Sequence, residues 1–355
     1  MDQKADIKTL YYEELEALIK KCGLPAFRAG QIFRWFHNNL ARDFDDLKNV
    51  GKETIGILKE NAALYPLTIV RVLESKLDGT KKFAFALNDG NIIESVFMRY
   101  KHGNSVCISS QAGCRMGCRF CASTVNGLAR NLTASEMLEQ VYEISRITGE
   151  RISNVVIMGS GEPLDNYDNT IRFIRLISDS EGYNMSRRNI TLSTCGLVPQ
   201  IKKLADEDLP VTLAISLHAP NDELRKKTMP IAQKYSVADI RDACVYYFEK
   251  TGRRVTFEYS VIKDLNDGRE TIDELARYLL PLHCHLNLIS VNPIKERNYA
   301  RVGDFSLSGI KKTLENKGIN VTIRRRLGSD IDSSCGQLRL ETMSEIKTQG
   351  KEGLS

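Results

Sequence analysis

The sequence predicts an α/β protein: a partial TIM-like barrel of about six (β/α) units, preceded by a small helical domain and a β-meander. Residues 1–65 place apolar side chains at helical spacing. Residues 66–103 alternate apolar and polar side chains, and from residue 104 onward short β-rich runs alternate with helical stretches. A doubly wound open sheet stays the alternative, because periodicity alone does not separate it from a barrel.

Composition and charge are those of a globular protein in a reducing compartment. Of 355 residues, 42% are hydrophobic and 27% are charged, and the net charge of +5 permits nucleic-acid binding without requiring it. No window approaches ~18 consecutive apolar residues, and the charged N-terminus has no signal-peptide core. A cytoplasmic protein without a membrane partner is therefore expected. Nine cysteines in so long a chain favour metal or thiol chemistry over a disulfide scaffold.

The first 103 residues are expected to form two accessory units. The runs "YYEELEALIKKCG" and "PAFRAGQIFRWFHNNL" predict helices in a domain spanning residues 1–65. Three alternating runs, separated by the turn sequences DG and NDG, predict an antiparallel meander over residues 66–103 that links this domain to the barrel.

The barrel is expected over residues 104–342, followed by a flexible polar tail at 343–355. Chemically unusual residues follow the runs "SVCISS", "NVVIM", "NITLST", "VTLAISLH" and "LNLISV". In βα barrels the carboxyl ends of the strands build the active site. Five such clusters therefore predict one site at that end of the barrel.

Three cysteines crowd the stretch "SSQAGCRMGCRFCAST": Cys114, Cys118 and Cys121, spaced C-x3-C-x2-C. A structural zinc site needs four ligands, and no second pair is visible nearby. A [4Fe–4S] cluster usually takes four thiolates, so three leave one iron open to bind the amine and carboxylate of a substrate. Zinc completed by a distant ligand stays the alternative.

The cysteine spacing resembles the signature of radical S-adenosylmethionine (SAM) enzymes. Over essentially the whole chain the sequence is similar to the RlmN/Cfr family of adenosine methyltransferases, and to its RlmN branch in "GEPL", "SLHAPND" and "NLISVNP". Further matching stretches are "GLPAFRAGQIFRWFH", "NVVIMGSGEPL", "RRNITLSTCGLVP", "MPI" and "DIDSSCGQL". Ser160 departs from the family, which often has methionine there.

This resemblance implies a radical SAM partial (β/α)6 barrel with one [4Fe–4S] cluster and two SAM molecules consumed per turnover. The cluster ligands would be Cys114, Cys118 and Cys121. The SAM contacts that carry over from the family are Gly161, Glu162, Ser193, Ser216, Leu217, His218 and Asn292.

Three further residues receive catalytic roles from the resemblance. Cys335 would carry the methyl group as S-methylcysteine, be activated by the adenosyl radical, and form a covalent adduct with RNA. Cys107 would resolve that adduct through a transient disulfide with Cys335, and Glu94 would accept the adenine proton. The expected reaction is methylation of adenine C2, a carbon too electron-poor to attack a SAM methyl group directly.

The implied partners are 23S rRNA, some tRNAs and an electron donor such as flavodoxin or ferredoxin, with the enzyme a monomer. Four basic clusters could contact RNA phosphates. Three other functions stay open: C8 methylation that confers antibiotic resistance, a radical SAM maturase that acts on protein, and a zinc-stabilised RNA-binding module. The basic clusters are Arg28, Arg34, Trp35 and His37; Lys81-Lys82; Arg187-Arg188; and Arg324-Arg325-Arg326.

Overall fold

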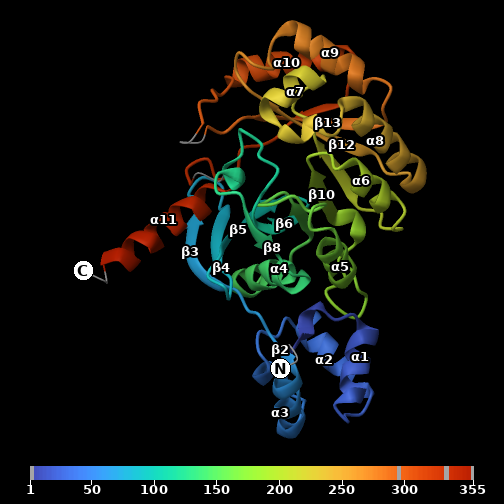
Figure 1. Ribbon diagram of the computed structural model, residues 1–355, viewed down its shortest axis with the longest axis vertical. Coiled ribbons are helices and arrows are strands. Elements are labelled where there is room, and N and C mark those ends of the chain that lie inside the picture. The colour runs from blue at the N-terminus through green and yellow to red at the C-terminus, as the bar shows by residue number, and fades with distance from the viewer. Residues whose placement is uncertain (1–3, 294–296, 332–335, 353–355) are drawn as a thin grey trace.

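The computed structural model describes residues 4–293, 297–331 and 336–352, with residues 346–352 as backbone only. Its centre is a ten-stranded sheet in the order β14-β13-β12-β11-β10-β9-β6-β5-β4-β3 (Figure 1). Seven of these strands are parallel: β6 (Gly103–Cys107), β9 (Asn154–Ile157), β10 (Ile190–Thr194), β11 (Thr212–Ser216), β12 (Val255–Val261), β13 (Cys284–Ser290) and β14 (Val321–Ile323).

The strand order confirms the partial barrel. Each parallel strand lies next to the one before it in the sequence, so the chain winds in a single direction. A doubly wound sheet would reverse its strand order near the middle. Seven parallel strands are one more than the six units predicted, because β14 adds a short last strand beside β13.

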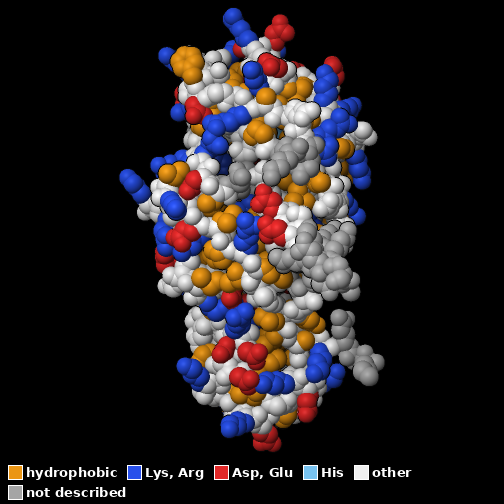
Figure 2. All heavy atoms as spheres, turned by 90° about the vertical axis from the view of Figure 1, so that its left-hand side faces the viewer, with side chains coloured by type: hydrophobic (Ala, Val, Ile, Leu, Met, Phe, Trp, Pro, Cys, Tyr) orange, Lys and Arg blue, Asp and Glu red, His pale blue; other side chains and the backbone are white. Residues whose placement is uncertain are grey.

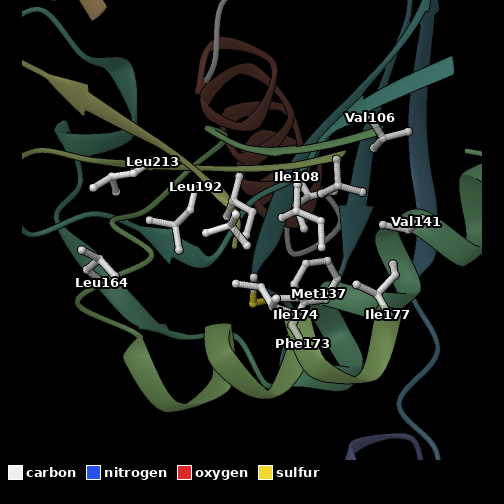
Figure 3. Close-up of a cluster of buried hydrophobic side chains, with 14 of the residues drawn as sticks. Val106, Ile108, Met137, Val141, Leu164, Phe173, Ile174, Ile177, Leu192 and Leu213 are labelled. Atoms are coloured by element: carbon white, nitrogen blue, oxygen red, sulfur yellow. The ribbon is translucent and has the colours of Figure 1, made fainter. Parts of the chain in front are cut away.

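Helices connect the parallel strands and cover their outer face. They are α4 (Ala134–Thr148), α5 (Tyr167–Ile177), α6 (Val198–Ala205), α7 (Asp222–Thr228), α8 (Val237–Thr251), α9 (Arg269–Leu279) and α10 (Asp304–Asn316). Thr133 begins α4 with a capping box, and Gly149 ends it in the left-handed conformation. Figure 3 shows the core between α4, α5 and the sheet, where Val141 and Phe173 approach Val106 and Leu192.

The predicted meander forms and extends the same sheet. β3 (Thr68–Glu74), β4 (Lys81–Ala86) and β5 (Ile92–Tyr100) are antiparallel, and β5 pairs antiparallel with β6. The helix α11 (Gln337–Glu352) lies beside these strands and crosses the predicted tail boundary after residue 342 (Figure 1). The domain boundaries themselves stay predictions.

The N-terminal helices form a small unit at one end of the molecule (Figure 1). They are α1 (Tyr12–Lys21), α2 (Phe27–His37) and α3 (Lys52–Asn61), and the strands β1 (Ala5–Asp6) and β2 (Ala62–Ala63) pair beside them. This unit contacts α4 through a buried ion pair between Lys8 and Glu139. No helix in the described ranges is long and apolar enough to cross a membrane.

Candidate active site

The three cysteines lie in a loop that follows β6 at its carboxyl end. This cysteine loop, residues 114–127, joins the short antiparallel strands β7 (Gln111–Gly113) and β8 (Leu128–Asn131). Cys114 N donates to the Gly127 carbonyl at 3.0 Å, which closes the loop at its base. Thr124 Oγ1 donates to the carbonyls of Cys118 and Cys121, each at 2.9 Å. The conformation of the loop is therefore fixed by hydrogen bonds among its own residues.

The cysteine loop faces a cavity of about 370 Å³, the site cavity. Its wall is formed by the carboxyl ends of the parallel strands, as the sequence predicts. The predicted site residues that line it are Cys107, Cys114, Cys118, Cys121, Gly161, Glu162, Ser193, Ser216, His218 and Asn292.

The donor set fits an iron–sulfur cluster better than a single metal ion. Burial, with the nearby Glu162 and Cys121 charges, raises the pKa of the Cys114 thiol to about 12, and burial with the other two thiolates raises the pKa of Cys118 well above its usual value. Three thiols this close need a cation to become thiolates together. No group of three His, Cys, Asp or Glu side chains of the described residues is arranged to hold a single metal ion. In a [4Fe–4S] cluster each thiolate would bind a different iron, so the three cysteines would not need to meet at one point.

Glycine is required at the turn after β9, where Gly159-Ser160-Gly161 meets the end of β6. A Cβ on Gly159 would lie 2.6 Å from the Ile108 carbonyl oxygen. Gly161 has a φ of +114°, and a Cβ there would lie 2.6 Å from Ser110 Oγ. The turn can therefore approach the start of the cysteine loop only with these glycines, and its backbone forms part of the cavity wall.

Glu162 connects this turn to the end of β10. Its carboxylate accepts hydrogen bonds from Cys195 N at 2.7 Å and from Leu164 N at 3.1 Å. Burial raises the pKa of Glu162, while these backbone donors lower it. The side chain thus holds two loops of the cavity wall together.

The ends of β10 and β11 present two hydroxyls to the cavity. Ser193 Oγ and Ser216 Oγ lie 3.5 Å apart. Behind them the buried guanidinium of Arg225 donates to three carbonyl oxygens: Cys195 at 2.6 Å, Leu217 at 3.1 Å and Ser216 at 3.2 Å. Leu217 itself is fully buried and is not a cavity-lining residue. Arg225 therefore fixes both strand ends from one side.

His218 is neutral and held in one tautomer. Its Nδ1 accepts a hydrogen bond from Ser260 N at 2.9 Å, so Nε2 carries the proton. Burial lowers the pKa of His218 to about 3, and its ring packs edge-on against Phe120 of the cysteine loop. The residue also has a φ of +58°, unusual for a non-glycine residue. His218 can donate a hydrogen bond into the cavity and cannot serve as a base there.

Glu94 is buried beside the cavity and holds the start of α11. Its Oε2 accepts from Gly336 N at 2.7 Å, and its Oε1 accepts from Arg339 N. Lys82 Nζ lies 3.4 Å from the carboxylate. Val96 on the same face of β5 lines the cavity, whereas Glu94 does not. Cys335 lies outside the described residues.

Sequence reasoning missed Glu258, in the middle of β12. Its side chain lines the cavity and is buried, Oε1 accepts from Asn287 Nδ2 at 2.9 Å, and Oε2 has no partner among the described residues. Burial raises the pKa of Glu258. A carboxylate in the middle of the predicted strand "RVTFEYSVI" was the signal that could have found it.

Two members of the predicted basic clusters are buried and cannot contact RNA. His37 is 1% exposed and bonded to Tyr142 at 3.0 Å, and Lys82 is fully buried beside Glu94. Arg34 pairs with Glu181 on the surface. On the side of the molecule toward which α11 extends, Lys and Arg are interspersed with Asp and Glu (Figure 2). Arg324, Arg325 and Arg326 instead line the site cavity.

The sheet and the three-thiol cavity define a radical SAM enzyme with a partial barrel. Residues 108–279 match the radical SAM superfamily, and residues 5–64 match the ribosomal RNA large subunit methyltransferase N-terminal domain. The chain belongs to the RlmN family of radical SAM methyltransferases, which confirms the resemblance seen in the sequence. As a radical SAM enzyme it uses a [4Fe–4S] cluster and SAM.

Two relatives and one crystal structure document this membership. The probable dual-specificity RNA methyltransferase RlmN of Lachnospira eligens is 58% identical, over 96% of this chain and 97% of its own. The protein of the same name from Lachnoclostridium phytofermentans is 56% identical, over 95% of each chain. A radical SAM methyltransferase from Sphaerobacter thermophilus is 42% identical and superposes with a TM-score of 0.90, covering 94% of this chain and 98% of that one.

Proposed function

We propose that this protein methylates C2 of an adenosine in 23S rRNA and in some tRNAs. The observation that carries the proposal is a single cavity lined by the three predicted cluster cysteines and also by Cys107, at the end of β6, and Cys195. A cluster that only transferred electrons would need no additional thiol beside it. The names of the relatives, dual-specificity RNA methyltransferases, support RNA as the substrate.

Cys114, Cys118 and Cys121 would hold the cluster, which with SAM supplies the methyl group, the electron and the adenosyl radical. The protein's part is to position SAM. Gly161 and Glu162, the hydroxyls of Ser193 and Ser216, the Leu217 backbone, His218 Nε2–H and Asn292 would contact it. These groups lie around one cavity or directly behind it, which supports the assignment.

Cys335 would carry the methyl group to the adenine. Gly336, the residue bonded to it, packs so closely on the cysteine loop that a Cβ would lie 2.6 Å from Ser123 N. Ser329, on the other side of the segment, lines the site cavity. The described residues on both sides of this segment thus support the assignment of the carrier role to Cys335.

Release of the product would need a second thiol and a base. After a bond forms between the methyl carbon on Cys335 and adenine C2, Glu94 would take the C2 proton. The Cys107 thiolate would then attack the Cys335 sulfur, so that an S–S bond forms and the S–C bond breaks with its electron pair left on carbon. That methylene carbon would take up a proton to become the methyl group of adenine, and the one electron that the radical adduct gives up would return to the cluster. Cys107 lines the cavity and Glu94 contacts the residue after Cys335, which supports both roles.

The remaining partners follow from the chemistry. A flavodoxin or ferredoxin would reduce the cluster, and the enzyme would act in the cytoplasm as a monomer. The base would be flipped or unpaired to reach the cavity, because its C2 edge is not accessible within a duplex.

Nucleoside mass spectrometry tests the proposal directly. RNA from cells lacking the protein should lose 2-methyladenosine from 23S rRNA and tRNA, and the purified, cluster-loaded enzyme should restore it. A product that is purely 8-methyladenosine would place the protein in the Cfr branch, and a methylation or radical modification found only on protein would make it a maturase. RNA that is unchanged in both experiments contradicts the proposal.

Two cysteine variants test the carrier mechanism. Cys335→Ala should transfer no methyl group and form no adduct, because the carrier sulfur is missing. Cys107→Ala should accumulate a covalent protein–RNA adduct, visible as a gel shift that resists denaturation. Cys284→Ala, half-buried and with its sulfur toward the Leu279 carbonyl, is the matched control. If all three behave like the wild type, the carrier mechanism is wrong.

A further inference from the structure

A second pocket, the amino-end pocket, continues the site cavity towards the other end of the barrel. It encloses about 250 Å³. Ser105, Asn154 and Thr191 line it, and these lie toward the amino ends of β6, β9 and β10. Met98, Tyr100 and Arg324 line both spaces, so the two share a wall.

The cysteine loop packs across part of the carboxyl end of the barrel. Arg119 N donates to the Thr228 carbonyl of α7 at 2.8 Å, and a Cβ on Gly117 would lie 3.4 Å from Pro230. Phe120 packs on His218 beneath the loop. The cysteine loop therefore covers part of this end, and the amino-end pocket, which shares Met98, Tyr100 and Arg324 with the site cavity, offers a second approach to it.

The amino-end pocket carries an aromatic pair. The rings of Tyr100 and His102 are stacked, with centroids 5.1 Å apart and planes 18° from parallel. Tyr100 is half-buried and His102 is exposed on the turn between β5 and β6. Stacked aromatic rings at the edge of a groove are the platform on which single-stranded nucleic acids place their bases.

The charge of the amino-end pocket is positive. Arg188 and Arg324 line it, and both are exposed. Its described lining includes no Asp or Glu, and the other polar groups are neutral amides and hydroxyls. Arg325 and Arg326 continue the same charge into the site cavity. This combination is complementary to a phosphate group joined to a base.

We propose that the amino-end pocket binds the nucleotide next to the target adenosine. The base of that neighbour stacks on the His102–Tyr100 pair, and its phosphate lies between Arg188 and Arg324. The target adenosine then passes over Tyr100 into the site cavity, toward Cys107. The proposal rests on the proposed RNA methyltransferase function, and it sets the direction from which RNA enters the barrel.

RNA binding by the cluster-loaded enzyme tests this, with a labelled hairpin that has the target adenosine in its loop. His102→Ala should weaken binding roughly tenfold, the effect of losing one stacked base. Arg188→Ala should reduce the slope of log K against log salt by about 1. The controls are His283→Ala, which removes an exposed histidine ring beside Phe248, and Arg241→Ala on α8. Both should bind RNA like the wild type.

An abasic nucleotide beside the target adenosine, placed on either side in turn, completes a double-mutant cycle. One of the two abasic RNAs should bind the wild type roughly tenfold more weakly, and His102→Ala should then cause no further loss. His102 is exposed, so an unchanged unfolding midpoint excludes misfolding as the cause.

The outcomes separate the two proposals. If the wild type methylates the hairpin while His102→Ala and Arg188→Ala bind it unchanged, only the pocket assignment is overturned. The pocket assignment alone is also overturned if the His102→Ala substitution weakens binding of both abasic RNAs by the same factor as it weakens binding of intact RNA. If the wild type binds no RNA at all, both the pocket and the proposed function fail.

Discussion

Two regions of the molecule bury ionisable side chains, and they satisfy them differently. In the contact between the N-terminal unit and α4, Lys8 donates to Glu139 and to the Ala41 carbonyl, and Arg146 donates to both Glu139 and Glu143. In the same contact one oxygen, Asp6 Oδ1, has no partner within the described ranges, and in the wall of the site cavity Glu258 Oε2 has none. Buried polar groups are normally paired. The N-terminal contact is thus held by mutually paired charges, whereas Glu258 is an unpaired carboxylate that lines a cavity and is available to a ligand.

The largest effect is expected on the cavity side, from Cys118→Ser. Removal of one of three ligands should reduce bound iron from about four atoms per chain to nearly none and abolish SAM cleavage. Iron analysis and 5′-deoxyadenosine formation measure this after anaerobic reconstitution. Cys22→Ser, in the N-terminal unit, should keep the full iron content. Zinc in place of iron in the wild type would contradict the cluster and favour a zinc-stabilised module.

On the scaffold side, Glu139→Gln should lower the free energy of unfolding by about 3 kcal/mol, because it leaves buried Lys8 without its counter-charge. Denaturant unfolding measures the loss. The double variant Lys8→Met/Glu139→Leu should recover most of it, since an apolar pair of similar volume needs no charge compensation. A loss below ~1 kcal/mol for the single variant would mean that water reaches this contact.

One buried histidine in each region gives a pH dependence. Burial lowers the pKa of both His37 and His218 to about 3, from 6.5. Between these values the unfolded chain binds more protons than the folded one. Each histidine should therefore reduce stability by ~1.4 kcal/mol per pH unit as the pH falls below 6.5. Urea unfolding at pH values from 4.5 to 7.5 measures how the unfolding free energy changes with pH. His37→Asn should reduce this pH dependence by the contribution of one histidine. An unchanged pH dependence would show that His37 is protonated in the folded protein.

The smallest stability change is expected for Glu258→Gln, the cavity counterpart of Glu139→Gln. The buried charge of Glu258 costs stability, as its raised pKa indicates, so its removal should leave the unfolding free energy unchanged within ~0.5 kcal/mol or increase it. SAM binding should weaken roughly fivefold, because a ligand loses its acceptor. A stability loss as large as that of Glu139→Gln would remove the distinction between the two regions.

Alternation and helical spacing were enough to predict the strand–helix order, the meander and the N-terminal helices, whereas the polar residues after the strands and the family resemblance were needed to favour a barrel over a doubly wound sheet. Alternation and helical spacing report which face of an element is apolar, and each parallel strand lies beside its predecessor, so little long-range information was needed. The polar residues after the strands were found in the same way, and they line one cavity. Their individual roles stay predictions.

What the sequence could not reveal were partners far away along the chain. His37 bonds to Tyr142, 105 residues later, and the Arg339 backbone bonds to Glu94, 245 residues earlier. A basic residue on a helix or strand is indistinguishable from a solvated one until its partner is known. For this reason His37 and Lys82 were assigned to RNA contacts although the fold buries them.

The bonds between Glu94 and the start of α11 have a consequence for the timing of turnover. Both oxygens of Glu94 face the first turn of α11, and Glu94 does not line the site cavity, so its carboxylate does not reach a base there while the helix is docked. If Glu94 is the proton acceptor, the C-terminal segment must undock once in every cycle. The rate of methylation would then depend on how quickly the start of α11 dissociates from Glu94, as well as on the chemistry at the cluster.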